Sequence, residues 1–199
     1  MRLGIYVGSF NPVHKGHIKI ANYIVDNNLV DKLLIIPTQN YWGKTNIISL
    51  QDRINMLKKY ETSRIIIDSD FSDLKYTYQI IDALSKKYKN SEFSLIIGAD
   101  NIVNFDKWVH YEDLLKHELI ILKRNDIDIN YYLKKLGKNE GYIIVSDLDE
   151  IDISSTMIRN NIEDESVLKQ YLDDEVIDYI KEKKLYRKRL YEKCYYRRL

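Results

Sequence analysis

Short apolar runs and helix-like segments alternate along the first 150 residues. The apolar runs contain many β-branched residues and do not alternate cleanly with polar ones; they lie at residues 2–7, 32–37, 64–68, 93–98, 118–124 and 141–145. Such runs are typical of strands buried on both faces of a parallel sheet. Segments with helical spacing lie between them, at residues 16–28, 49–60, 76–88, 107–117 and about 127–136. We therefore expect an α/β fold with an open parallel sheet and right-handed crossovers.

The pattern changes after residue 150. The stretches "ISSTMIRNNI" (153–162) and "LDDEVIDYIKEKKLY" (172–186) predict two helices with no strand between them. No linker rich in Gly, Pro or Ser divides the chain. We expect one domain over residues 1–186, with a core of about 1–150 and a short helical C-terminal part of about 151–186. Residues 187–199 form a basic, tyrosine-rich tail.

Composition limits the classes of function. The net charge of the 199 residues is +1, which argues against a surface built to bind a polyanion, so any phosphate binding must come from a local site. The single cysteine, Cys194, cannot form an internal disulfide and excludes a cysteine-rich metal site. We find no signal-peptide pattern and no apolar stretch near 20 residues. The expectation is a cytoplasmic protein without a membrane or nucleic-acid partner.

The first candidate site is the loop "GSFNPVHKGH" (8–17), which joins the first predicted strand to a helix. Ligands of open α/β sheets bind at such loops, and a helix start offers unpaired N–H groups to phosphate. Gly8 permits a close backbone approach, and His14 and His17 could each donate a hydrogen bond to a phosphate oxygen, more strongly if protonated. On these residues alone, a structural capping pair or a zinc site remains an alternative.

The second candidate site is "ISSTMIR" (153–159). Ser154 or Ser155 can cap the following helix, and their hydroxyls surround its first turn together with Thr156. Arg159 stands one turn beyond Ser155 on the same face. A capped helix end beside an arginine is a plausible anion site, although an ordinary capped helix would show the same pattern.

Together the two stretches resemble the nucleotidyltransferase superfamily, whose elements are G-[ST]-F-[DN]-P-x-H-x-G-H and I-S-S-T-x-x-R. The resemblance implies a Rossmann-like fold that binds ATP, with both histidines on the triphosphate. An acceptor phosphate then attacks the α-phosphorus and pyrophosphate leaves, with Mg²⁺ held mainly by the ATP phosphates rather than by the protein. The residues expected at ATP are Gly8, Ser9, Phe10, His14, His17, Gly98, Asp100, Ile153, Ser154, Ser155, Thr156 and Arg159. Of these, His14, His17 and Arg159 are the expected catalytic residues.

Three further stretches resemble the nicotinate-nucleotide adenylyltransferases. They are "IIGADNIVNFDKWVHYEDLL" (96–115), "KYTYQIIDAL" (75–84) and "LKRND" (122–126). The resemblance implies that Asp100 meets a ribose and that Trp108 stacks on the pyridine ring of a mononucleotide, although Trp108 could instead be a core residue. The residues expected at the acceptor are Asn11, Lys44, Thr77, Trp108 and Arg124. The chain departs from the family at "PTQNYWGK" (37–44), where only the lysine matches the usual proline-proline-histidine-lysine run.

The sequence thus predicts an adenylyltransferase that transfers AMP from ATP to nicotinate mononucleotide, giving nicotinate adenine dinucleotide and pyrophosphate in NAD biosynthesis. Nicotinamide mononucleotide as the preferred acceptor is one alternative, and a pantetheine-phosphate adenylyltransferase is another. The non-enzymatic alternatives are a nucleotide-binding sensor and an RNA-binding module that uses the tail at 187–199. Self-association is left open.

Overall fold

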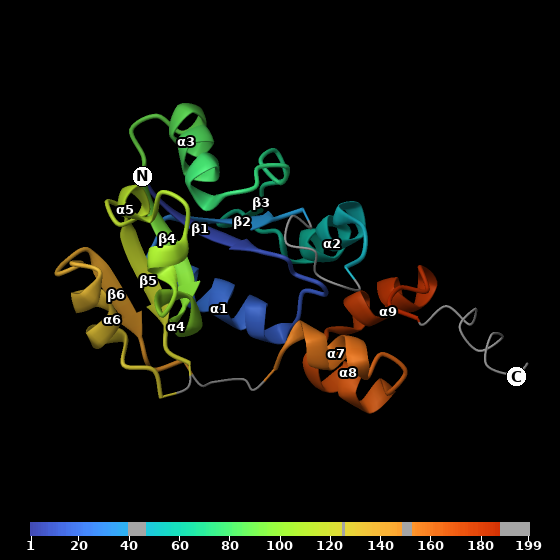
Figure 1. Cartoon of the computed structure of the whole chain (residues 1–199). Helices are drawn as coiled ribbons and strands as arrows, with labels where there is room; N and C mark the ends of the chain where they lie inside the picture. The colour runs from blue at the N-terminus through green and yellow to red at the C-terminus, as the bar shows by residue number, and fades with distance from the viewer. Residues whose placement is uncertain (40–46, 125, 149–152, 188–199) are drawn as a thin grey trace, which may run out of the picture.

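The structure is a computed structural model and describes residues 1–39, 47–124, 126–148 and 153–187. Its centre is a parallel sheet in the order β3-β2-β1-β4-β5-β6 (Figure 1). The strands are β1 (Arg2–Gly8), β2 (Lys32–Pro37), β3 (Ile65–Ile67), β4 (Glu92–Gly98), β5 (Glu118–Leu122) and β6 (Tyr142–Val145). This confirms the predicted Rossmann-like α/β fold. The strand order reverses between β1 and β4, which is where ligands bind in such sheets.

The apolar runs are continuous because the sheet has a hydrophobic core on each face. Successive residues of a strand point to opposite faces. In β2, Leu33 and Ile35 belong to one core, whereas Leu34 and Ile36 belong to the other. Odd and even positions of a strand therefore face different cores, and both need apolar side chains. The alternating polar positions that mark a half-exposed strand are absent for this reason.

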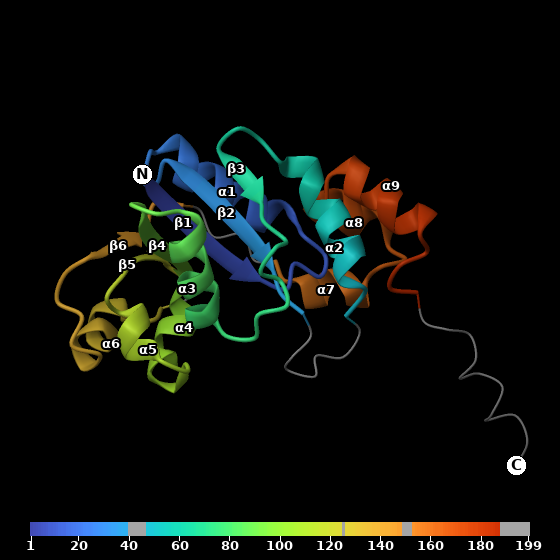
Figure 2. The same ribbon diagram turned by 90° about the horizontal axis from the view of Figure 1, so that it is seen from above.

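Helices cover both faces of the sheet. They are α1 (Lys15–Asp26), α2 (Leu50–Leu57), α3 (Thr77–Lys87), α4 (Ala99–Ile102), α5 (Tyr111–Leu114), α6 (Ile129–Lys135), α7 (Ser155–Asn160), α8 (Glu165–Tyr171) and α9 (Asp174–Glu182), with 3₁₀ turns η1 (Lys58–Tyr60) and η2 (Phe105–Lys107). Figure 2 shows α3 to α6 gathered on one side and α2, α8 and α9 on the other. None of the described helices is long and apolar enough to cross a membrane.

The segment predicted as one helix over 107–117 is broken. The turn η2 ends at Trp108, whose backbone is extended, and α5 begins after His110, which is left-handed with φ of 56°. Phe105 and Leu114 on the two sides of the break are both buried in the same core. Burial of Phe105 and Leu114 therefore overrides the helical spacing of this segment. As a result, Trp108 lies on an extended segment rather than on a helix face.

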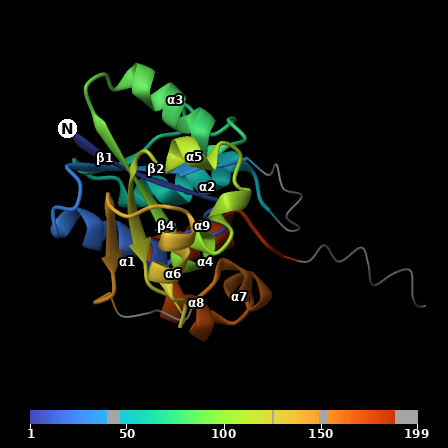
Figure 3. The ribbon, with the colours of Figure 1, turned by 60° about the vertical axis from the view of Figure 1, so that its left-hand side comes forward.

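The C-terminal part contains three helices among the described residues, where the sequence predicted two. The additional helix is α8, whose first turn is capped by the Asp164 carboxylate, which accepts from the N–H groups of Ser166 and Val167. Figure 3 shows α7 and α8 side by side, far from α3. Ile158, Leu168 and Val176 of these helices share a hydrophobic core with α1 and the sheet. That shared core holds the second motif close to the first.

Candidate active site

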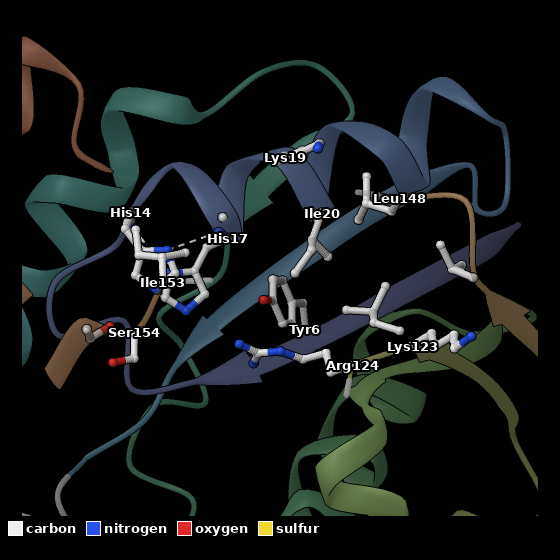
Figure 4. A pocket seen from close by; sticks show the side chains of 14 residues that line it. Tyr6, His14, His17, Lys19, Ile20, Lys123, Arg124, Leu148, Ile153 and Ser154 are labelled. Atoms are coloured by element: carbon white, nitrogen blue, oxygen red, sulfur yellow. Dashed lines mark hydrogen bonds between the residues drawn. The ribbon is translucent and has the colours of Figure 1, made fainter. Parts of the chain in front are cut away.

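Three adjoining cavities lie where β1, β4 and β5 end. The histidine cavity, of about 230 Å³, is lined by His14, His17, Arg124, Ile153 and Ser154 among others (Figure 4). The tryptophan cavity, of about 400 Å³, is lined by Ser9, Thr38, Thr77, Lys107 and Trp108 among others. A smaller central cavity of about 150 Å³ shares Tyr6 and Arg124 with the first and Thr77 and Trp108 with the second. The site is therefore elongated, with room for two ligand groups that meet in the middle.

The two histidines cap α1 reciprocally. The backbone N–H of His17 donates to the His14 carbonyl at 2.9 Å and makes a longer contact of 3.4 Å with Nδ1 of His14. The backbone N–H of His14 donates to Nδ1 of His17 at 3.3 Å. Because both Nδ1 atoms accept, the proton of each neutral imidazole lies on Nε2. Each ring therefore keeps one donor that its cap does not use.

Both imidazoles are neutral in the free protein. Burial, followed by the charge of Arg124, lowers the pKa of His14 to about 4. Burial, His14 and Arg124 lower the pKa of His17 well below its usual value. The rings stack with centroids 3.6 Å apart, and the edge of Phe10 packs against His17 at 5.0 Å. The pair is a stacked set of N–H donors beside the cation of Arg124, which is an arrangement suited to an anion.

Helix α7 is fastened to the histidine loop by its own motif. Ser154 caps the helix by accepting from the Met157 N–H at 3.1 Å. The Ser155 hydroxyl donates to the Pro12 carbonyl at 2.9 Å, and Nη1 of Arg159 donates to the Asn11 carbonyl at 2.7 Å. The two motifs are thus one structural unit, in which the second holds the backbone of the first.

Gly16 lies where these two motifs touch. A Cβ on Gly16 would lie 3.0 Å from Cγ2 of Ile153 and 3.1 Å from the His14 ring. The absence of a side chain at Gly16 lets α1 approach the segment before α7, so Ile153 can close one wall of the histidine cavity.

Positive charge surrounds the histidine cavity. Lys19, Lys123 and Arg124 line it, and no carboxylate does so among the described residues. Figure 4 shows Arg124 reaching into the cavity below Tyr6, opposite the histidine pair. Burial strongly raises the pKa of Tyr6, so its hydroxyl stays protonated. Arg124 was predicted at the acceptor, but it lies between the histidine and central cavities, where it can reach groups in both.

The tryptophan cavity is aromatic and basic. Trp108 is partly buried and stacks on Phe105, with ring centroids 5.0 Å apart. Lys75 and Lys107 line the cavity with Thr77, and its described walls carry no carboxylate. This combination of a flat ring, a hydroxyl and two ammonium groups fits a flat ligand with negative charge.

The other predicted residues have varied surroundings. Gly8 and Ser9, predicted at ATP, line the tryptophan cavity, whereas Gly98 and Asp100 line the central one. The remaining predictions line none of the three cavities; they are Phe10, Asn11, Thr156 and Arg159. Phe10 packs on His17, Asn11 is 5% exposed, and Arg159 donates to Thr156 and to the loop. Lys44 lies outside the described residues.

Two residues at the site were missed by the sequence analysis. Arg53 of α2 is 1% exposed and donates to the carbonyl of Ser9 in the histidine loop and to that of Thr38, the first residue after β2. The hydroxyl of Tyr186, beyond α9, donates to Oδ1 of Asn11 at 2.9 Å. The helical spacing signalled only that Arg53 is buried, because it stands one turn before Leu57 on the apolar face of its helix, and it signalled nothing for Tyr186.

No group of three or more His, Cys, Asp or Glu side chains in the described ranges could hold a metal ion. The histidines belong to the helix cap, and the nearest carboxylate among the cavity walls described is that of Asp100 in the central cavity.

Comparisons with known proteins identify the family of the chain. The model of the Cytidylyltransferase-like family matches residues 5–161. The chain is 32% identical over 197 residues to a Flavobacterium johnsoniae protein named "Probable nicotinate-nucleotide adenylyltransferase", a match that covers 94% of this chain and 100% of the relative. A Borreliella afzelii protein of the same name is 35% identical over 198 residues, covering 96% of this chain and 99% of the relative.

Solved structures share the fold. A Plasmodium falciparum nicotinic acid mononucleotide adenylyltransferase complexed with NaAD superposes with a TM-score of 0.80 at 23% identity, covering 93% of this chain and 97% of that one. Because the identity is low, this likeness supports the fold, and the sequence matches carry the family assignment. The chain therefore belongs to the Cytidylyltransferase-like family and, within it, to the nicotinate-nucleotide adenylyltransferases.

Proposed function

We propose that the protein transfers AMP from ATP to nicotinate mononucleotide, with the triphosphate in the histidine cavity and the acceptor in the tryptophan cavity. The observation that carries the proposal is the reciprocal histidine cap, which leaves an Nε2–H donor on each of two histidines that line a cavity together with Lys19, Lys123 and Arg124. An acceptor phosphate in the central cavity would lie between this anion site and the aromatic one.

The reaction needs no attacking side chain. A phosphate oxygen of the acceptor attacks the α-phosphorus of ATP and forms a new P–O bond. The bond from that phosphorus to the bridging oxygen breaks, and pyrophosphate leaves with the electron pair. His14, His17 and Arg124 would stabilise the negative charge that develops, and the two cavities would hold the reactants in line.

Magnesium fits this site as an ion that arrives with ATP. Asp100 is the carboxylate that the described cavity walls offer, and hard oxygen ligands are those that Mg²⁺ prefers. When bound, the ion would neutralise charge on the phosphates. The protein's own part is to bind the phosphate oxygens through N–H donors.

The charge of the tryptophan cavity favours nicotinate over its amide. Lys75 and Lys107 attract a carboxylate and give nothing comparable to a neutral carboxamide, while Trp108 offers its face to either ring. Thr77 lines both the central and tryptophan cavities, where its hydroxyl could donate to a carboxylate. These residues support nicotinate mononucleotide as the preferred acceptor.

The test is pyrophosphate release from Mg²⁺-ATP with one acceptor at a time. We expect rapid release with nicotinate mononucleotide, slower release with nicotinamide mononucleotide and none with phosphopantetheine. Equal rates with the two pyridine nucleotides would overturn the acceptor preference. Silence with all three would overturn the proposed reaction and would favour a nucleotide-binding sensor.

A further inference from the structure

Arg53 is a buried cation that the proposed chemistry does not use. Its side chain lies on the core face of α2 and is 1% exposed. Burying a guanidinium is costly unless its donors are satisfied. No ion pair joins Arg53 to a carboxylate within the described part of the chain, and its Nε has no hydrogen-bond partner there. What offsets this cost is the pair of hydrogen bonds that Arg53 makes to backbone carbonyls.

The hydrogen bonds of Arg53 join two strand ends. Nη1 donates to the Ser9 carbonyl and to the Thr38 carbonyl, both at 2.7 Å. Ser9 is the first residue after β1, and Thr38 is the first residue after β2. The ladder between these strands ends with the Thr38 N–H donating to Gly8 at 3.0 Å. Arg53 therefore links the chain after β1 to the chain after β2, just beyond the last backbone hydrogen bond between the two strands.

Both of these strand ends are walls of the tryptophan cavity. Ser9 and Thr38 line it together with Thr77 and Trp108, and neither Ser9 nor Thr38 lines the histidine cavity. The later carbonyls of the histidine loop, at Asn11 and Pro12, are held by α7 instead. The loop is thus fastened from two sides, by α7 near the histidines and by Arg53 near the acceptor.

We propose that Arg53 is a positioning residue for the acceptor: by clamping the Ser9 and Thr38 carbonyls, it sets the width of the tryptophan cavity and hence the affinity for the mononucleotide. This inference rests on the proposed function. Arg53 touches neither reactant in this proposal and acts only through the backbone that it holds.

Arg53→Met is the main test variant. Methionine fills similar space without a charge, and replacing a buried charge by an apolar side chain often leaves a protein folded. We expect the KM for nicotinate mononucleotide to rise about tenfold, with the KM for ATP changing by less than about twofold, because a small displacement of a positioning wall weakens only the ligand beside it. Arg53→Lys keeps a donor and should restore part of the acceptor affinity.

Arg64→Met is the matched control. Arg64 also donates to two backbone carbonyls, those of Val30 at 2.9 Å and Asp31 at 3.2 Å, but it precedes β3 at the opposite end of the sheet. It should lower thermal stability without altering either KM. Comparing the two variants separates the general effect of losing an arginine that binds backbone carbonyls from the effect specific to Arg53.

The outcomes distinguish the inference from the proposed function. An unchanged acceptor KM in folded Arg53→Met, or equal rises in the KM values for acceptor and ATP, would overturn the positioning role. If Arg53→Met does not fold, the same two KM values in Arg53→Lys decide, since the shorter lysine side chain cannot place its nitrogen where Nη1 holds both carbonyls. A wild-type protein inactive with nicotinate mononucleotide would instead overturn the proposed function.

Discussion

The histidine cavity and the tryptophan cavity are built in different ways. The first depends on directed hydrogen bonds: each histidine caps the other, and α7 holds two carbonyls of the loop. The second depends on surface and charge: Trp108 lies against Phe105, and two lysines stand at the walls. Removing a donor or an acceptor abolishes a hydrogen bond completely, whereas a change of ring or of a distant charge only reduces the interaction energy. Changes in the first cavity should therefore act on rate, and changes in the second on acceptor affinity.

The largest effect is expected at His17. Replacing it with alanine removes one Nε2–H donor from the anion site, and one well-placed donor of this kind contributes about 100-fold or more to kcat. Steady-state pyrophosphate release measures the change, and circular dichroism verifies the fold. A loss of less than about threefold would remove His17 from the mechanism, and with it the view that the histidine cavity controls the rate.

The histidine cap should also make stability depend on pH. The pKa of His14 is about 4 in the folded chain and 6.5 in a model peptide, so between these values the unfolded chain binds more protons. The free energy of unfolding should therefore decrease as the pH falls from about 6.5 towards 4, by about 3 kcal/mol from this group.

His14→Gln isolates that contribution, because glutamine keeps polar atoms but does not titrate. Urea unfolding at pH 7 and pH 5 should show a smaller decrease for the variant than for the wild type. His117→Gln serves as the control for a histidine outside the site. Burial also lowers the pKa of His117, but this residue lines none of the three cavities. The same pH dependence in His14→Gln and the wild type would contradict the assignment of a low pKa to His14.

The tryptophan cavity should respond through affinity. Trp108→Leu keeps an apolar side chain but removes the ring face, and stacking of a base on an aromatic ring is worth about 1–3 kcal/mol. We expect the KM for nicotinate mononucleotide to rise about tenfold, with kcat changed little. Trp108→Phe retains a smaller ring and should lie between the two. A fall in kcat with an unchanged acceptor KM would contradict the view that the tryptophan cavity acts on affinity and the histidine cavity on rate.

The same distinction explains what the sequence could predict. Strands were predictable because both faces of the sheet require apolar residues, and His14 and His17 because their spacing is part of a motif. The break at His110 was not, since burial of Phe105 and Leu114 overrode a helical pattern. Arg53 and Tyr186 were not predictable as parts of the site. They bond to loop residues 44 and 175 positions away, and the partners of Arg53 are carbonyls, which every residue has.

The smallest effect is expected where the C-terminal segment meets the histidine loop. The Tyr186 hydroxyl donates to Oδ1 of Asn11, which also accepts from the Ile48 N–H at 3.3 Å. Tyr186→Phe removes one of these two bonds and leaves the ring in place. A net loss of about 1 kcal/mol is typical of one such hydrogen bond. If the loop depends on each of its fastenings, kcat should fall about threefold together with the decrease in stability.

Tyr60→Phe is the matched control for Tyr186→Phe. The Tyr60 hydroxyl donates to the Asp173 carboxylate at 2.7 Å, so it joins η1 to the start of α9 without touching the histidine loop. Its loss should lower the melting temperature by a similar amount and leave kcat unchanged. Equal kinetic losses in both variants would mean that global stability rather than the loop limits the rate. A fall in kcat confined to Tyr186→Phe would show that the segment after α9 also helps to hold the histidine loop, although it lies outside both motifs in the sequence.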